Sequence, residues 1–220
     1  MHVRAALLDV DGTLVDSNDA HARAWVDAFA ECGHAIPLER VAPLIGKGGD
    51  KLMPEVSGVK SESDEGKRID TRRSAIFKER YLPNLKPFPR ARELLERMRG
   101  AGLTLVVATS AKKEEMEPLL EVCGGTELVT LRTSSDDAEN SKPDGDIIAA
   151  ALARAKVGAR EALMLGDTPY DIEAASRVGV ATVALRSGGW EDVALEGAVA
   201  IYADASDLLQ RFESSPFARR

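Results

Sequence analysis

The apolar residues of this chain form two patterns that alternate along much of its length. Short and nearly continuous apolar runs predict buried strands. These runs are residues 3–8, 103–108, 128–131, 162–165, 180–185 and 199–202. Between them, apolar residues recur at helical spacing. The helices predicted there are residues 91–98, 112–121, 146–156 and 170–178. Strands that alternate with helices are typical of an α/β protein with a parallel, doubly wound sheet.

Residues 16–85 lack apolar runs of the strand type. The helices predicted in this segment are residues 19–32, 38–45, 50–56 and 63–81. Residues 60–73 carry many charges, which we interpret as a solvated helix face rather than a binding site. Residues 82–89 contain three prolines and predict a semi-rigid return linker. We therefore expect an all-helical insertion, residues 16–85, in a core made of residues 1–15 and 86–220.

The composition is that of an ordinary globular protein, with 44% apolar and 30% charged residues. A net charge of −7 argues against binding to nucleic acid or to an anionic membrane surface. No apolar run approaches the roughly 18 residues of a membrane-spanning helix. The first predicted strand begins almost at once, which leaves no room for a signal peptide. Cys32 and Cys123 are expected to be reduced thiols, so we expect a cytoplasmic protein. The composition does not indicate an oligomeric state.

The first predicted strand ends in Asp9-Val10-Asp11-Gly12-Thr13. In an open parallel sheet the ligand crevice lies outside the carboxyl ends of the strands. Carboxylates two residues apart can offer one side chain and one backbone carbonyl to a cation, leaving the other carboxylate for proton transfer. Gly12 lets an anion approach the backbone, and the Thr13 hydroxyl can fix the loop. Taken alone, the pair could also be a solvated turn.

Matching polar residues lie at later strand and loop ends. Thr109-Ser110 follows the second strand, Lys142 precedes a predicted helix, and Asp167 and Asp171 follow the strand at residues 162–165. Each has an ordinary structural explanation, as a helix cap or a surface charge. Their occurrence in one order at successive strand ends instead predicts one shared site.

These motifs, in this order, resemble those of the haloacid dehalogenase superfamily, in particular its phosphatase branch. The Asp-x-Asp-Gly-Thr motif begins at Asp9, the strand-ending Ser or Thr matches Thr109, and the Lys-Pro motif matches Lys142. The Gly-Asp-x-x-x-Asp motif matches residues 166–171. The resemblance covers nearly the whole chain and implies a Rossmann-like core with a small α-helical cap, which would be residues 16–85.

The resemblance implies a role for each carboxylate. Asp9 would be the nucleophile that forms an aspartyl-phosphate, and Asp11 the general acid and base. Mg²⁺ would be bound by the Asp9 side chain, the Asp11 carbonyl and Asp167. Asp171 would hold a metal-bound water or orient Lys142. Because the dehalogenase and phosphonate-cleaving branches lack the second aspartate, we expect neither activity.

The remaining motif residues would bind the substrate phosphate. Thr109 and the backbone N–H groups of Gly12 and Ser110 would donate to its oxygens. Lys142, together with the metal, would reduce the repulsion between Asp9 and the phosphate dianion. We expect the substrate to be a small phosphorylated metabolite, with phosphoglycolate, sugar phosphates and nucleoside monophosphates all open.

The start of the insertion resembles the β-phosphoglucomutase and phosphoglycolate phosphatase subgroup, which places a histidine over the active site at the position of His21. His21 could instead be a core residue of its helix. The mutase has an arginine near the position of Gly49, but the loop at residues 44–50 contains only Lys47 as a cation. A lysine lacks the bidentate geometry of arginine. We therefore expect a phosphatase, with Lys47 as a candidate substrate contact, rather than a mutase or a non-catalytic binding protein.

Overall fold

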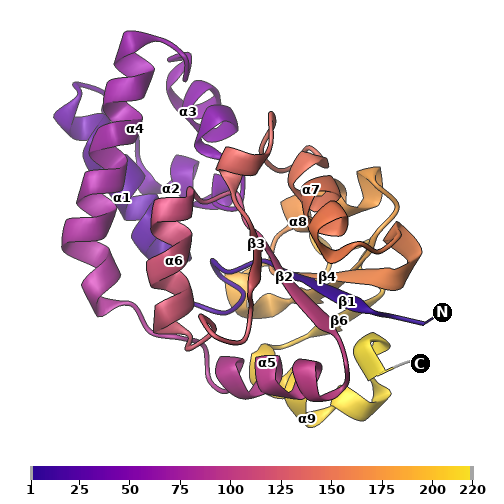
Figure 1. The fold of residues 1–220 in the computed structure, drawn as a ribbon. Coiled ribbons are helices and arrows are strands. Elements are labelled where there is room, and N and C mark those ends of the chain that lie inside the picture. Colours follow the sequence, from indigo (N-terminus) through magenta and orange to yellow (C-terminus); the bar gives the residue numbers. More distant parts are fainter. Residues whose placement is uncertain (1, 219–220) are drawn as a thin grey trace.

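The computed structural model describes residues 2–218, whose strands form a parallel sheet (Figure 1). The strands are β1 (Ala5–Leu8), β2 (Thr104–Ala108), β3 (Leu131–Thr133), β4 (Ala162–Gly166), β5 (Ala181–Leu185) and β6 (Ala200–Tyr202). They lie in the order β3-β2-β1-β4-β5-β6, and every pair is parallel. The order reverses beside β1, as in a doubly wound sheet. The predicted α/β fold is confirmed.

Helices cover both faces of the sheet. On one face α7 (Asp146–Ala155) and α8 (Pro169–Arg177) pack against the side of β1 that carries Ala5 and Leu7. On the other face, α5 (Ala91–Gly100), α6 (Lys113–Val122) and α9 (Ala205–Gln210) pack against the side that carries Ala6 and Leu8. Successive residues of a strand point to opposite faces, so a sheet covered on both sides needs continuous apolar runs.

The segment between β1 and α5 is helical, and Figure 1 shows it beyond the end of the strands, away from both termini. Its α-helices are α1 (Asn18–Glu31), α2 (Leu38–Val41), α3 (Gly49–Ser57) and α4 (Asp64–Ile76). A π-helical turn (Phe77–Tyr81) and a 3₁₀ turn (Leu82–Asn84) then lead back to the core. We call residues 16–85 the helical insertion.

Several predicted elements have different bounds in the structure, and for two of them the local cause is visible. The α-helix expected over residues 38–45 ends at Val41 and continues as a 3₁₀ turn, Ala42–Leu44, since Pro43 has no N–H group for an α-helical hydrogen bond. The strand expected over residues 128–131 begins only at Leu131, since residues 125–129 form a hydrogen-bonded turn. Pairing with β2 then extends that strand to Thr133, whose hydroxyl donates to the Val107 carbonyl.

The register brings the polar motifs to one edge of the sheet. Leu8 at the end of β1 pairs with Val107 of β2 and with Leu165 of β4. Residues that follow these three strands therefore emerge together. Within residues 2–218, no helix is both long enough and apolar enough to cross a membrane.

Candidate active site

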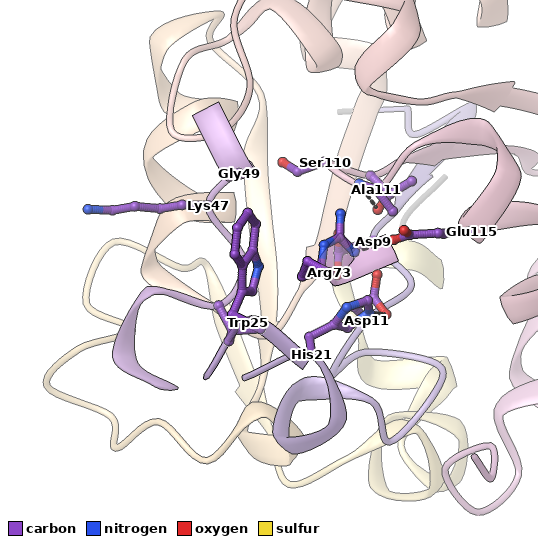
Figure 2. Close-up of a pocket in the computed structure, with 13 residues that line it drawn as sticks. Asp9, Asp11, His21, Trp25, Lys47, Gly49, Arg73, Ser110, Ala111 and Glu115 are labelled. Atoms are coloured by element: carbon purple, nitrogen blue, oxygen red, sulfur yellow. Dashed lines mark hydrogen bonds and ion pairs between the residues drawn. The ribbon is translucent and has the colours of Figure 1, made fainter. Parts of the chain in front are cut away.

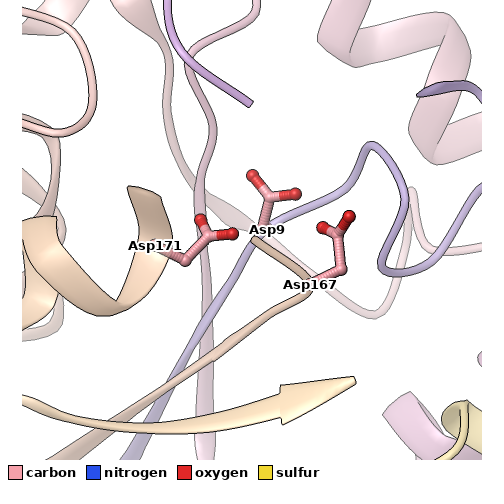
Figure 3. Close-up of side chains that lie close together, drawn as sticks. All are labelled: Asp9, Asp167 and Asp171. Carbon is pink, nitrogen blue, oxygen red and sulfur yellow. The ribbon is translucent and has the colours of Figure 1, made fainter. Parts of the chain in front are cut away.

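Three buried carboxylates meet at the carboxyl ends of β1 and β4. Asp9 follows β1, Asp167 follows β4, and Asp171 lies in the first turn of α8. One oxygen from each lies within 4.8 Å of the others, and Figure 3 shows the three side chains side by side. Burial raises the pKa of Asp167 to about 7, and the neighbouring Asp171 contributes to this rise. Burial also raises the pKa of Asp9 well above its usual range.

Lys142 supplies the positive charge of this cluster. Its Nζ donates to Asp9 Oδ1 at 2.6 Å and to Asp171 Oδ1 at 2.7 Å, and the residue is only 1% exposed. Although burial alone would lower the pKa of Lys142, the ion pairs with Asp171 and Asp9 raise it above its ordinary value. The lysine is therefore a fixed cation between two carboxylates, and Asp171 orients it toward Asp9.

Asp11 is held from the helical insertion. Its Oδ1 accepts a hydrogen bond from Ser17 Oγ at 2.5 Å and lies 2.8 Å from His21 Nε2. Burial opposes ionisation of Asp11, but the contacts with His21 and Ser17 outweigh it and lower the pKa of this carboxyl. The His21 ring stacks on Phe77 with centroids 4.0 Å apart. His21 is thus buried on its helix and also contacts a motif carboxylate.

The loop after β1 is shaped around Asp167. Thr13 Oγ1 donates to Asp167 Oδ1 at 2.8 Å, and Asn18 Nδ2 donates to Oδ2 at 2.9 Å. Gly12 has a φ of 73°, and a Cβ built there would overlap Asp167 Oδ2 and Asn18 Nδ2. Only glycine fits this position without moving the carboxylate.

The two candidate hydroxyl groups lie at the end of β2. Thr109 is buried, and its Oγ1 accepts from the backbone N–H of Ala111 at 3.1 Å. Ser110 Oγ accepts from the backbone N–H of Lys142 at 3.4 Å. Both residues line the same cavity as Asp9 and Asp11, so the structure brings these motif residues together.

That cavity lies between the core and the helical insertion (Figure 2). The core contributes Asp9, Thr109 and Ser110, and the insertion contributes His21 and Arg73, among others. Its volume is about 60 Å³, which corresponds to roughly two waters at about 30 Å³ each. Pockets that hold small molecules measure about 300–1,000 Å³. In the described conformation the pocket is therefore too small to hold a metabolite.

Comparison with known proteins identifies the family. The model of a family described as haloacid dehalogenase-like hydrolases matches residues 6–185. The chain belongs to the haloacid dehalogenase-like hydrolases. All four motifs lie within the matched residues. The resemblance predicted from them is therefore confirmed.

Three relatives of this hydrolase show how far the similarity extends. The phosphoglycolate phosphatase of Rhodospirillum rubrum is 30% identical over 93% of this chain and 89% of its own. The protein SUPPRESSOR OF QUENCHING 1, chloroplastic, of Arabidopsis thaliana is 31% identical over 84% of this chain, which spans only 18% of that protein. The crystal structure of a hydrolase from Pseudomonas syringae has a TM-score of 0.88 and 27% identity, covering 96% and 98% of the two chains.

Lys47 of this hydrolase lies at the pocket but does not join the motif residues. Its Nζ pairs with Glu55 Oε2 at 2.6 Å and lies 5.0 Å from the centre of the Tyr170 ring. In Figure 2 its side chain points away from Asp9 and Arg73. In this conformation Lys47 is engaged with the insertion's own carboxylate.

Arg73 and Glu115 are pocket residues that the sequence interpretation missed. Arg73, on α4, is 7% exposed, so the interpretation of residues 60–73 as a solvated face is wrong at this position. Its Nη1 donates to Glu115 Oε2 on α6 at 2.6 Å. The available signal was spacing: Ile69, Arg73 and Ile76 lie on one helical face, and all three are buried.

Proposed function

We propose that this protein is a Mg²⁺-dependent phosphatase that hydrolyses the phosphate monoester of a small metabolite through an aspartyl-phosphate. The observation that carries the proposal is the pairing of Asp9 with Lys142 at 2.6 Å inside a cluster of three buried carboxylates. The family membership and the phosphatase name of the Rhodospirillum relative support the same reaction class. We take the substrate to be a phosphorylated small molecule, in keeping with the phosphoglycolate phosphatase relative.

The donor set fits a magnesium ion. Mg²⁺ prefers oxygen ligands from a few carboxylates, carbonyls and waters. We assign the Asp9 and Asp167 side chains and the Asp11 backbone carbonyl as its protein ligands. Burial and mutual repulsion raise the pKa values of Asp9 and Asp167, a cost that a bound cation relieves. When bound, the ion neutralises charge on the phosphate oxygens. Asp171 already bonds Lys142 and Thr168, so we assign it to positioning Lys142.

The residues of the chain then catalyse hydrolysis in two steps. An Asp9 carboxylate oxygen forms a bond to phosphorus while the ester P–O bond breaks, and Asp11 gives a proton to the departing alkoxide. In the second step Asp11 takes a proton from water, whose oxygen attacks phosphorus and releases Asp9. The second step leaves Asp11 protonated again, so the cycle balances without another proton donor, and His21 Nε2, 2.8 Å from Asp11, positions its carboxyl group. Thr109, Ser110 and the Gly12 N–H group hold the phosphate oxygens.

We infer that residues 16–85 act as a cap that opens to admit substrate and closes over Asp9. The small size of the cavity supports this inference, because its walls come from both the core and the insertion. The segments at residues 14–16 and 82–89 would be the hinges. Closure would expel water and bring His21, and with rearrangement Lys47, toward the substrate.

The test is hydrolysis of p-nitrophenyl phosphate with Mg²⁺ and with excess chelator. We expect turnover only with Mg²⁺, and none for Asp9→Asn, whose amide is isosteric but not nucleophilic. Asp19→Asn, at an exposed position paired with Arg23, is the matched control and should behave as wild type. Activity in chelator would refute the metal assignment. A tenth or more of the wild-type rate in Asp9→Asn would refute the covalent step.

A phosphosugar mutase is the second candidate, because the structure brings a buried arginine to the pocket although the loop at residues 44–50 has none. Against it, Arg73 is already paired with Glu115 and is therefore not free to bind a second phosphate. Isomerisation of a sugar phosphate that depends on a bisphosphate primer would favour the mutase.

A further inference from the structure

The buried pair of Arg73 and Glu115 forms a wall of the pocket that the reaction chemistry does not use. The two residues are 7% and 1% exposed, and they join the insertion to the core. Both line the cavity that contains Asp9. Figure 2 shows Arg73 between Trp25 and Glu115, and its Cζ lies 5.2 Å from the centre of the Trp25 ring.

Each residue of the pair has one buried polar atom that makes no hydrogen bond to the described residues. Among the described residues, neither Arg73 Nε nor Glu115 Oε1 has a hydrogen-bond partner, and both atoms are buried. Buried polar groups are nearly always paired, and leaving one unpaired costs free energy. One atom is a donor and the other an acceptor. A hydroxyl group, which donates and accepts at once, would satisfy both.

The charges around Arg73 argue against an anionic ligand. Glu115 Oε2 is 2.6 Å from Nη1, and Asp70 Oδ1 is 3.5 Å from Nη2. Asp70 is in turn paired with Lys112. Two cations and two carboxylates therefore balance at this wall. A carboxylate or second phosphate placed here would be repelled by Glu115, while Arg73 and Lys112 are already engaged with carboxylates.

We propose that Arg73 and Glu115 select a neutral leaving group that carries hydroxyls, as in a polyol or sugar monophosphate, and reject one that carries a further negative charge. This inference rests on the proposed phosphatase function. Arg73 Nε donates to a hydroxyl of the bound substrate, and Glu115 Oε1 accepts from it. Trp25 lies against the guanidinium and limits its movement.

The test compares kcat/KM for three phosphomonoesters: glycerol 1-phosphate, propyl phosphate and phosphoglycolate. They present hydroxyls, no polar group and a carboxylate, respectively. For the wild type we expect glycerol 1-phosphate to exceed each of the others by about tenfold or more, since hydrogen bonds to charged groups discriminate to this extent. A wild type that prefers phosphoglycolate, or does not distinguish propyl phosphate, overturns the inference.

Glu115→Gln removes the negative charge with little change of shape. We expect it to reduce the preference for glycerol 1-phosphate over phosphoglycolate by about tenfold, because Arg73 is then free to bind a carboxylate. Glu114→Gln is the matched control: Glu114 is the preceding residue of α6 and pairs with Lys78 of the insertion, but its side chain is 79% exposed. Its substrate ratios should equal those of the wild type. Equal ratios in both variants overturn the inference.

A double variant distinguishes a loss of substrate selectivity from a loss of folding. Arg73→Gln with Glu115→Gln removes both charges together, so no uncompensated buried charge remains. We expect cooperative thermal unfolding and a preference for glycerol 1-phosphate over propyl phosphate below about threefold. A double variant that keeps the wild-type ratio overturns the assignment to this pair. If the wild-type enzyme with Mg²⁺ does not hydrolyse p-nitrophenyl phosphate either, the phosphatase proposal itself fails, and the inference fails with it.

Discussion

Replacing Gly12 with alanine tests whether the first loop is built around the Asp167 carboxylate. Gly12 has a φ of 73°, and a Cβ there would overlap Asp167 Oδ2 and lie 2.7 Å from Asp167 Cγ. The same Cβ would overlap Asn18 Nδ2, which donates to Asp167. Gly12→Ala must therefore move the loop or displace the carboxylate that we assign to the metal.

Two costs combine in this variant. A left-handed backbone costs a residue with a Cβ about 1–2 kcal/mol. Loss of the Asn18 hydrogen bond to a carboxylate adds about 1.5–3 kcal/mol. The free energy of unfolding should fall by their sum, about 2.5–5 kcal/mol. Gly58 is a matched control, because its φ is 74° and nothing lies within 4 Å of a Cβ built there. Gly58→Ala carries the first cost alone.

The assay combines urea unfolding with a Mg²⁺ titration of p-nitrophenyl phosphate hydrolysis. We expect Gly58→Ala to keep the wild-type Mg²⁺ response. Gly12→Ala should need about 10–100-fold more Mg²⁺, the usual effect of losing a partner of a metal ligand. Equal losses of stability in the two variants, with unchanged Mg²⁺ responses, would refute the view that this loop positions Asp167.

Two further predictions concern proton transfer and thiol reactivity. Asp11→Asn should lower kcat by about 10²–10⁴-fold for alkyl phosphates and much less for aryl phosphates, whose leaving groups need no proton; equal losses on both would make Asp11 structural. Burial raises the pKa of the Cys123 thiol to about 11, and this residue is 2% exposed. Iodoacetamide at pH 8 should therefore label the half-buried Cys32 and spare Cys123 until the protein unfolds, and mass spectrometry showing early labelling at Cys123 would contradict this.

The motif residues could be predicted because local patterns determine where they lie. The strands β1, β2 and β4 each end one residue before Asp9, Thr109 and Asp167, respectively. A parallel sheet covered on both faces requires continuous apolar runs and brings the carboxyl ends of its strands to one edge. Nothing beyond strand pairing was needed to bring these groups together.

Arg73 could not be predicted in the same way, because its environment depends on tertiary contacts. Its partner Glu115 is 42 positions away and belongs to the core. The charges that surround Arg73 in the sequence are at exposed or half-buried positions of α4, and among them Arg73 is the one buried charge. The spacing with Ile69 and Ile76 shows the buried face, but not that a carboxylate would cover the guanidinium.

The chemistry of the contacts between insertion and core supports our proposal that the insertion moves. The ion pairs and hydrogen bonds that join the two parts include Lys78 with Glu114, Lys112 with Asp70, Ser141 with Asp50, and Arg73 with Glu115. Exposed ion pairs contribute about 0–1 kcal/mol each, because water replaces the partner when they separate. Arg73 with Glu115 is the buried exception among these four contacts. Opening would expose both of its charges to water and closing would desolvate them again, so a hydroxyl that pairs their remaining atoms would favour the closed state. Recognition of the leaving group and closure of the cap would then be a single event.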